Sequence, residues 1–140
     1  MKKVIINKCY GGYSISPKAA LWLFEKGFNE DDFKIPADKY FLDEEDKERD
    51  LKEWKEYLQF DQKSRASFLT IFSPDEKFVL NSRPKNRNHP LLVECVETLG
   101  KKADGGCADL KIVEIPDGVE YEIQEYDGVE WIAEKHQTWG

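Results

Sequence analysis

The sequence predicts an α+β fold whose strands form a mainly antiparallel sheet. Two helices carry both a start and a stop signal, and the C-terminal third holds short alternating strands separated by tight-turn residues. This pattern is typical of antiparallel hairpins. The N-terminal segment 3–9 is apolar and β-branched in its centre, and we therefore predict it to be the first strand. The 140 residues fit one domain, 1–140, with a single core.

Two core helices are marked by their ends. Ser16 is a suitable N-cap, Pro17 suits the first helical position, and Gly27 suits the left-handed position after the last turn. The second helix is expected to begin at Pro90 and to end at Leu99, just before a glycine. Apolar residues recur along one side of each helix, so both are predicted to pack into the core.

The middle of the chain is acidic and predicts a third helix of a different kind. Residues 28–42 alternate aromatic and polar types without a period, and we predict a loop there. Residues 43–60 are rich in charge, with a narrow apolar stripe that includes Leu51 and Trp54, which indicates a surface helix. The whole segment 28–66 is therefore interpreted as an acidic helical insertion on the surface of the domain.

A central hairpin and a C-terminal three-stranded meander complete the predicted sheet. The hairpin joins 67–72 to 77–81 through a Ser-Pro-Asp-Glu turn at 73–76. The meander strands are expected at 110–115, 119–126 and 129–134, and Asp127-Gly128 joins the last two. Alternation places Val119, Tyr121, Ile123, Val129, Trp131 and Ala133 on the core face, and most of Glu114, Glu120, Glu122, Glu125 and Glu130 on the solvent face.

The composition argues against several classes of protein. The formal net charge of -7 argues against polymeric nucleic acid as a partner, because such binding needs a basic face. A small phosphorylated ligand is compatible with it, since two or three local donors suffice. No apolar run approaches the ~18 residues that span a bilayer, and the apolar stretch near the N-terminus is too short for a signal peptide. We expect no membrane association and a cytoplasmic location.

No catalytic or metal-binding pattern is recognisable. The histidines are His89 and His136, and the cysteines are Cys9, Cys95 and Cys107; none of them stand at metal-ligand spacing. Cys95 lies among apolar residues of its helix and is interpreted as core, and the odd number of cysteines fits free thiols in a reducing compartment. We predict a binding protein rather than an enzyme, with no catalytic residue, no metal site and no cofactor.

One segment has features of a phosphate-binding loop. Tyr10-Gly11-Gly12-Tyr13-Ser14 lies between the first strand and the first helix. Adjacent glycines allow a ligand to approach the backbone, and the following helix start adds partial positive charge. The segment lacks the lysine and the spacing of a Walker A loop or a dinucleotide fingerprint. The alternative interpretation is a tight turn whose glycines serve only the backbone geometry.

A second candidate segment, 83–89, is basic within an acidic chain. Arg83, Lys85 and Arg87 could hold a phosphate through paired hydrogen bonds, and Phe78 just upstream could stack on a base. The alternative is a solvated loop whose charges balance the acidic insertion. The candidate ligand-binding residues are Tyr10, Gly11, Gly12, Tyr13, Ser14, Phe78, Arg83, Arg87 and Asn88. The functional hypothesis requires both loops to enclose one ligand.

Three segments carry a resemblance to known proteins. They are 2–16 (KKVIINKCYGGYSIS), 87–94 (RNHPLLVE), and the closing run from 110 (LKIVEIPD, then EYDG and EKH). In these segments the chain resembles a widespread group of small phage-encoded proteins, and within it the first described type of anti-Thoeris sponge protein. The resemblance covers roughly the first 25 and the last 55 residues. It implies a homo-oligomer that binds cyclic ADP-ribose-type signals without cleaving them.

Three functional hypotheses follow. The leading one is a phage anti-defence protein that sequesters a cyclic nucleotide immune signal in the cytoplasm of an infected bacterial host. The second is an acidic inhibitor or adaptor that contacts a host protein through the 43–60 helix by charge complementarity. The third is a small hydrolase or phosphodiesterase that acts through His89 or His136.

Overall fold

A computed structural model describes residues 2–30, 32–59, 70–106 and 108–134. It confirms an α+β fold with antiparallel sheets. In chain order the elements are β1 (Lys2–Asn7), α1 (Pro17–Glu25), β2 (Lys34–Pro36), α2 (Ala37–Tyr40), α3 (Glu44–Gln59), β3 (Ile71–Phe72), β4 (Phe78–Leu80), α4 (Pro90–Leu99), the 3-10 turn η2 (Gly100–Ala103), β5 (Leu110–Ile115), β6 (Tyr121–Tyr126) and β7 (Val129–Glu134). None of the helices in these ranges is long and apolar enough to cross a membrane.

The described strands form three small sheets, and the predicted C-terminal meander is wrong. β5 pairs with β1 in an antiparallel register that sets Val4 opposite Val113, whereas β6 pairs with β7. The physical reason lies in β1, where Val4, Ile5 and Ile6 are all at most 1% exposed. A strand that is apolar on both sides must be covered on both faces, so the β6–β7 hairpin packs over the β1–β5 sheet instead of extending it.

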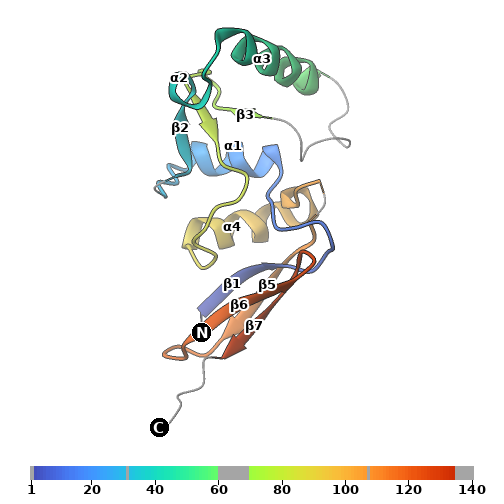
Figure 1. Cartoon of the computed structure of the whole chain (residues 1–140). Helices are drawn as coiled ribbons and strands as arrows, with labels where there is room; N and C mark the ends of the chain where they lie inside the picture. Colours follow the sequence, from blue (N-terminus) through green and yellow to red (C-terminus); the bar gives the residue numbers. More distant parts are fainter. Residues whose placement is uncertain (1, 31, 60–69, 107, 135–140) are drawn as a thin grey trace.

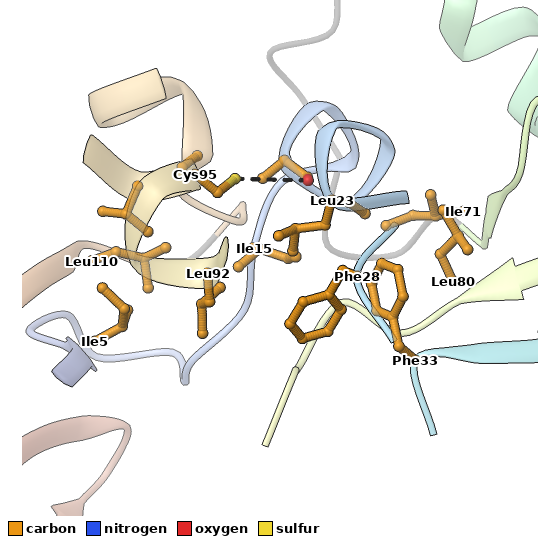
Figure 2. Packing of buried hydrophobic residues seen from close by; sticks show 14 of the residues in the cluster. Ile5, Ile15, Leu23, Phe28, Phe33, Ile71, Leu80, Leu92, Cys95 and Leu110 are labelled. Carbon is orange, nitrogen blue, oxygen red and sulfur yellow. Dashed lines mark hydrogen bonds between the residues drawn. The ribbon is translucent and has the colours of Figure 1, made fainter. Parts of the chain in front are cut away.

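The molecule is therefore layered around β1 and β5. On one face, Ile5 and Leu110 pack into the main core with Leu92 of α4, as Figure 2 shows. On the other face, Val4 and Ile6 form a second apolar cluster with residues of the β6–β7 hairpin. Figure 1 shows α4 above this sheet, the hairpin below it, and α3 at the opposite end of the molecule.

The hairpin turn fixes which side chains of β7 face inward, and this corrects the predicted faces. Asp127 and Gly128 have φ of 53° and 93°, as a type I′ turn requires. Cross-strand partners share a face, and Ile123 is paired with Ile132. Even-numbered residues of β7 thus lie on the same face of the hairpin as odd-numbered residues of β6. The inward placement of Val129, Trp131 and Ala133 is wrong: Trp131 is 39% exposed and Glu130 only 5%.

The helix ends follow the predicted signals. The Ser16 side chain accepts a hydrogen bond from the N–H of Ala19, Pro17 is the first residue of α1, and Gly27 has a φ of 80°. At α4, the Nδ1 atom of His89 accepts a hydrogen bond from the N–H of Leu91 at 3.1 Å. His89 is thus the N-cap of α4, where serine or asparagine would be more usual.

The segment 28–42 is more ordered than predicted. It contains β2 and α2 in place of a continuous loop, because two of its aromatic residues are anchored in the core. Phe28 and Phe33 are fully buried and meet edge to face, with ring centroids 4.9 Å apart. β2 then pairs with β4, where Ile35 lies opposite Val79. The acidic segment therefore contributes to the core as well as to the surface.

The acidic helix and the central hairpin are confirmed within the described residues. α3 buries Trp54, which stacks on Tyr57 at 5.5 Å between ring centroids. β3 and β4 are antiparallel around the predicted turn, and the Ser73 hydroxyl contacts the carboxylate of Asp75 at 2.6 Å. The first part of the predicted strand 67–72 and the end of the predicted insertion lie outside the described residues.

The core holds a titratable thiol whose effect on stability can be measured. Cys95 is fully buried, and its Sγ donates to the carbonyl oxygen of Ala19 (Figure 2). Burial raises the pKa of the Cys95 thiol from 9.0 to about 12. Above the lower value the unfolded chain releases this proton and the folded chain retains it, so stability falls as the pH rises through this window.

We expect the free energy of unfolding of the wild type to fall above pH 9, by up to about 1.4 kcal/mol per pH unit from this group. Cys95→Ala should have a shallower alkaline slope, measured by urea unfolding at several pH values. Val96→Ala, a neighbouring core truncation without a thiol, controls for lost packing and should keep the wild-type slope. Equal slopes for the wild type and Cys95→Ala would contradict the prediction.

Candidate functional site

The glycine loop, residues 10–14, connects β1 to α1 and packs against the β6–β7 turn. Gly11 and Gly12 have φ of 129° and 97°, a backbone region that favours glycine. A Cβ atom added at Gly128 would lie 2.5 Å from the nitrogen of Gly12 and 2.7 Å from that of Gly11. The loop and the hairpin turn are therefore in direct backbone contact. Their glycines do serve backbone geometry, as the alternative interpretation proposed.

The basic loop, residues 83–89, is fixed along β1. The carbonyl oxygen of Arg87 accepts a hydrogen bond from the N–H of Ile5 at 2.8 Å. The N–H groups of Lys85 and Asn86 donate to the two carboxylate oxygens of Glu30, at 3.0 and 2.6 Å. Backbone hydrogen bonds thus hold a segment that looks like a free polar loop in the sequence.

The two loops meet at Tyr13. Its hydroxyl donates to the carbonyl oxygen of Pro84 at 2.7 Å, and the guanidinium of Arg87 lies 3.3 Å from the centre of its ring. Burial raises the pKa of the Tyr13 phenol, so the hydroxyl remains a donor across the physiological pH range. A buried hydrogen bond and a cation–π contact therefore join segments about seventy positions apart.

Arg87 is engaged inside the protein, which changes its expected role. Its guanidinium forms two parallel hydrogen bonds with the carboxylate of Glu130, at 2.7 and 2.9 Å, the strongest common geometry for such a pair. The side chains of Arg87 and Glu130 are 15% and 6% exposed. Glu130 was expected on the solvent face, and that expectation is wrong. The type I′ turn fixes the register that turns Glu130 inward.

Asn7, at the end of β1, extends this buried network and was missed by the sequence analysis. It is fully buried, its backbone N–H donates to Glu130 at 2.8 Å, and its side-chain amide donates to the carbonyl oxygen of Gly128 at 2.7 Å. Its Oδ1 accepts from the N–H of Asp109 at 2.8 Å. An asparagine at a strand end carries no pattern that identifies it as a junction of three segments.

Both loops line one open pocket of about 430 Å³, within the range of small-ligand sites. The lining residues are Gly12, Tyr13, Arg83, Pro84, Lys85, Arg87, Glu125 and Glu130. The geometric condition set by the sequence analysis, that the glycine loop and the basic loop converge, is therefore met. Lys85, Glu125 and Glu130 were not among the candidate ligand-binding residues. The register of the β6–β7 hairpin is the signal that could have placed Glu125 and Glu130 on the same face.

The other candidate residues lie outside this lining set. Tyr10 is 69% exposed, and Ser14 is buried against Gly105, where an added Cβ would meet its hydroxyl. Phe78 lies in β4, with the ammonium of Lys34 5.8 Å from its ring centre. Gly11 and Asn88 also do not line the pocket. Of the nine candidates, the structure brings Gly12, Tyr13, Arg83 and Arg87 together.

His89 and Cys95 each have a structural role in the described part of the chain. His89 is committed to the cap of α4, and its ring meets Phe28 edge to face at 4.6 Å. Cys95 is in the core. No group of three or more His, Cys, Asp or Glu residues among those described is arranged to hold a metal ion. His136 and Cys107 lie outside the described residues.

Comparisons of this chain with protein-family models, with curated proteins and with solved structures found no match. What the site can bind is therefore inferred from its own geometry and charges. Arg83 and Lys85 are exposed at the pocket, whereas the charge of Arg87 is balanced by Glu130. The cationic groups that face solvent there thus come from the start of the basic loop.

A glycine pair tests the contact between the glycine loop and the hairpin turn. Gly118 and Gly128 have φ of 82° and 93°, but a Cβ at Gly118 would have nothing within 4 Å. Gly118→Ala should cost about 1 kcal/mol for the backbone conformation. Gly128→Ala should cost about 1–3 kcal/mol more from the clash, measured by urea unfolding. Equal losses would contradict direct contact.

A double-mutant cycle tests the buried ion pair. Arg87→Met and Glu130→Gln should each destabilise the protein by about 3–5 kcal/mol, because each leaves one buried charge without its partner. The double variant should recover part of this loss, with a coupling energy above about 2 kcal/mol. The same cycle on Lys3 and Glu97, whose side chains are 40% and 47% exposed, should give at most about 1 kcal/mol. Similar coupling in both cycles would show that the Arg87–Glu130 pair does not hold the hairpin.

Proposed function

We propose that this chain binds a cyclic nucleotide immune signal of the cyclic ADP-ribose type in the shared pocket and sequesters it without cleaving it. One observation carries the proposal: the glycine loop and the basic loop, distant in sequence, line one pocket. The resemblance of 2–16 and 87–94 to small phage-encoded proteins covers the glycine loop and the end of the basic loop, from Arg87 to His89. The proposed setting is an anti-defence protein, acting as a homo-oligomer in the cytoplasm of an infected bacterial host.

In this proposal, the phosphates lie on the side of the pocket formed by Arg83 and Lys85. Both side chains are exposed, and the guanidinium of Arg83 can give two parallel hydrogen bonds to a phosphate. Lys85 forms an ion pair with Asp32 at 3.1 Å, with both side chains more than two-thirds exposed. Such a surface pair is weak, so a phosphate can replace the carboxylate.

Arg87 acts as a positioning residue in this proposal. It packs on Tyr13 and binds Glu130, so it holds the walls of the pocket at a fixed separation. Gly12 adds room, since a Cβ built there would have nothing within 4 Å, and a ligand can approach the backbone closely. A rigid pocket reduces the ordering cost of binding, which favours the slow release that sequestration needs.

Two lining residues that could act as a general base are already held in hydrogen bonds. The Tyr13 hydroxyl is held by Pro84, and the carboxylate of Glu130 is held by Arg87 and Asn7. A general base must reach the proton that it abstracts. Tyr13 and Glu130 are already committed, and Glu125 is the carboxylate of the described lining that stays exposed. No histidine, cysteine or serine is among the lining residues within the described ranges.

The acidic helix supports a second candidate function. α3 has seven acidic and four basic residues within Glu44–Gln59, and Leu42 and Leu58 beside that charge are 102% and 47% exposed. Exposed apolar residues next to acidic ones would suit a basic protein partner. α3 and the β6–β7 hairpin are at opposite ends of the molecule (Figure 1). Variants can therefore separate the two functions.

The test is calorimetric titration with cyclic ADP-ribose isomers, followed by heating the complex and identifying the released ligand. Arg83→Ala should weaken binding at least about tenfold, because hydrogen bonds to charged groups are among the stronger ones. Arg49→Ala, an exposed arginine of α3, is the matched control and should bind like the wild type. Intact ligand should be recovered after heating.

Two results would contradict the proposal. Release of a linear product would make the protein an enzyme, and full affinity in Arg83→Ala would place the ligand elsewhere. The second candidate function predicts the opposite dependence. Exchanging Glu45 and Glu48 for Gln, together with Leu58→Ser, would then abolish anti-defence activity in infected cells, while Arg83→Ala would leave it unchanged.

A further inference from the structure

The pocket is not uniformly basic, because β6 contributes Glu125 to its lining. The hairpin register sets Glu125 directly opposite Glu130, so both carboxylates are on the same face of the hairpin. Like charges in directly opposed positions destabilise a strand pair. The positive charge of Arg87 offsets this repulsion at Glu130 but not at Glu125.

The two carboxylates differ in the hydrogen bonds that they accept. Glu130 accepts hydrogen bonds on both oxygens, from Arg87 on each and from the N–H of Asn7 on one. Glu125 is exposed, and its side chain has no hydrogen bond or ion pair with the residues that the structure describes. A carboxylate is an acceptor only. The β6 wall of the pocket therefore offers two acceptor oxygens where the basic loop offers donors.

We propose that Glu125 accepts hydrogen bonds from ribose hydroxyls of the bound nucleotide and thereby selects nucleotides over simple phosphates. This inference rests on the function proposed above. A phosphate beside Glu125 would be repelled, so the phosphates belong at Arg83 and Lys85 and the part of the ligand at Glu125 must carry donors. The two neighbouring hydroxyls of a ribose match the two oxygens of a carboxylate, an arrangement that acidic residues use in dinucleotide sites.

Besides the ribose hydroxyls, the ligand has one other donor, the exocyclic nitrogen of its base. The experiment must show which of these donors binds Glu125. Calorimetric titrations use cyclic ADP-ribose, its analogues that lack one ribose hydroxyl, and cyclic inosine diphosphate ribose. The last probe keeps the hydroxyls and replaces the exocyclic nitrogen with oxygen. The proteins are the wild type, Glu125→Gln and Glu122→Gln, each checked for folding by its thermal unfolding midpoint.

The wild type should bind one deoxy analogue at least about tenfold more weakly than cyclic ADP-ribose, since the lost bond is to a charged group. In Glu125→Gln the affinities for the deoxy analogue and for cyclic ADP-ribose should differ by no more than about threefold. Inorganic pyrophosphate should bind this variant more tightly than the wild type, because a repulsive charge is removed. Glu122→Gln makes the same charge change on the other face of β6. It should keep the wild-type ratio.

The outcomes distinguish this inference from the function on which it rests. If the wild type binds cyclic ADP-ribose and Glu125→Gln keeps the wild-type ratio, the ribose assignment is wrong and the sequestering function stands. The wild type could instead prefer cyclic ADP-ribose over the inosine analogue and lose that preference in Glu125→Gln. Glu125 would then contact the base, and the ribose assignment is again wrong. If the wild type binds none of the cyclic probes, both proposals fail.

Discussion

The buried ion pair between Arg87 and Glu130 holds together three segments that are far apart in the chain. It joins the basic loop to β7 through two short hydrogen bonds, and the same two side chains bond the backbone of β1 at Ile5 and Asn7. In a site of low dielectric, such a pair is favourable only while both partners are present. This pair therefore links the β7 wall of the pocket to the basic loop, and the hairpin has no comparable ionic contact with the rest of the described chain.

Because of the same pair, the cations of the basic loop have two different roles. Arg87 is the most buried of its three cations and faces inward, whereas Arg83 and Lys85 stay in contact with solvent. A buried, neutralised arginine gives rigidity, and an exposed one gives a charge that a ligand can reach. Glu125 then adds an acceptor wall to the pocket. The result is a site with donors on one side and an acceptor on another, which fits a ligand that carries both phosphates and hydroxyls.

The arrangement of layers follows from β1, whose three central residues are buried on both faces of the strand. α4 covers one face, and the hairpin covers the other. Because the hairpin must pack over this sheet, its turn reaches the glycine loop, where Gly128 approaches Gly11 and Gly12. The cavity beside Tyr13 is a consequence of this packing.

Local signals in the sequence were enough for the elements but not for their assembly. The caps at Ser16 and Gly27, the apolar stripe of α3 and the Asp127-Gly128 turn act over a few residues, so the α+β class and most helix and strand positions could be predicted. The short β2 was missed because it depends on pairing with β4 and on the hydrogen bond from the N–H of Asn81 to the carbonyl oxygen of Phe33, both contacts distant in sequence. Sheet partners, the inward turn of Glu130 and the convergence of the two loops depend on which surfaces meet. Only the tertiary structure decided these, because burying β1 on both faces and satisfying a buried charge are requirements of the whole fold.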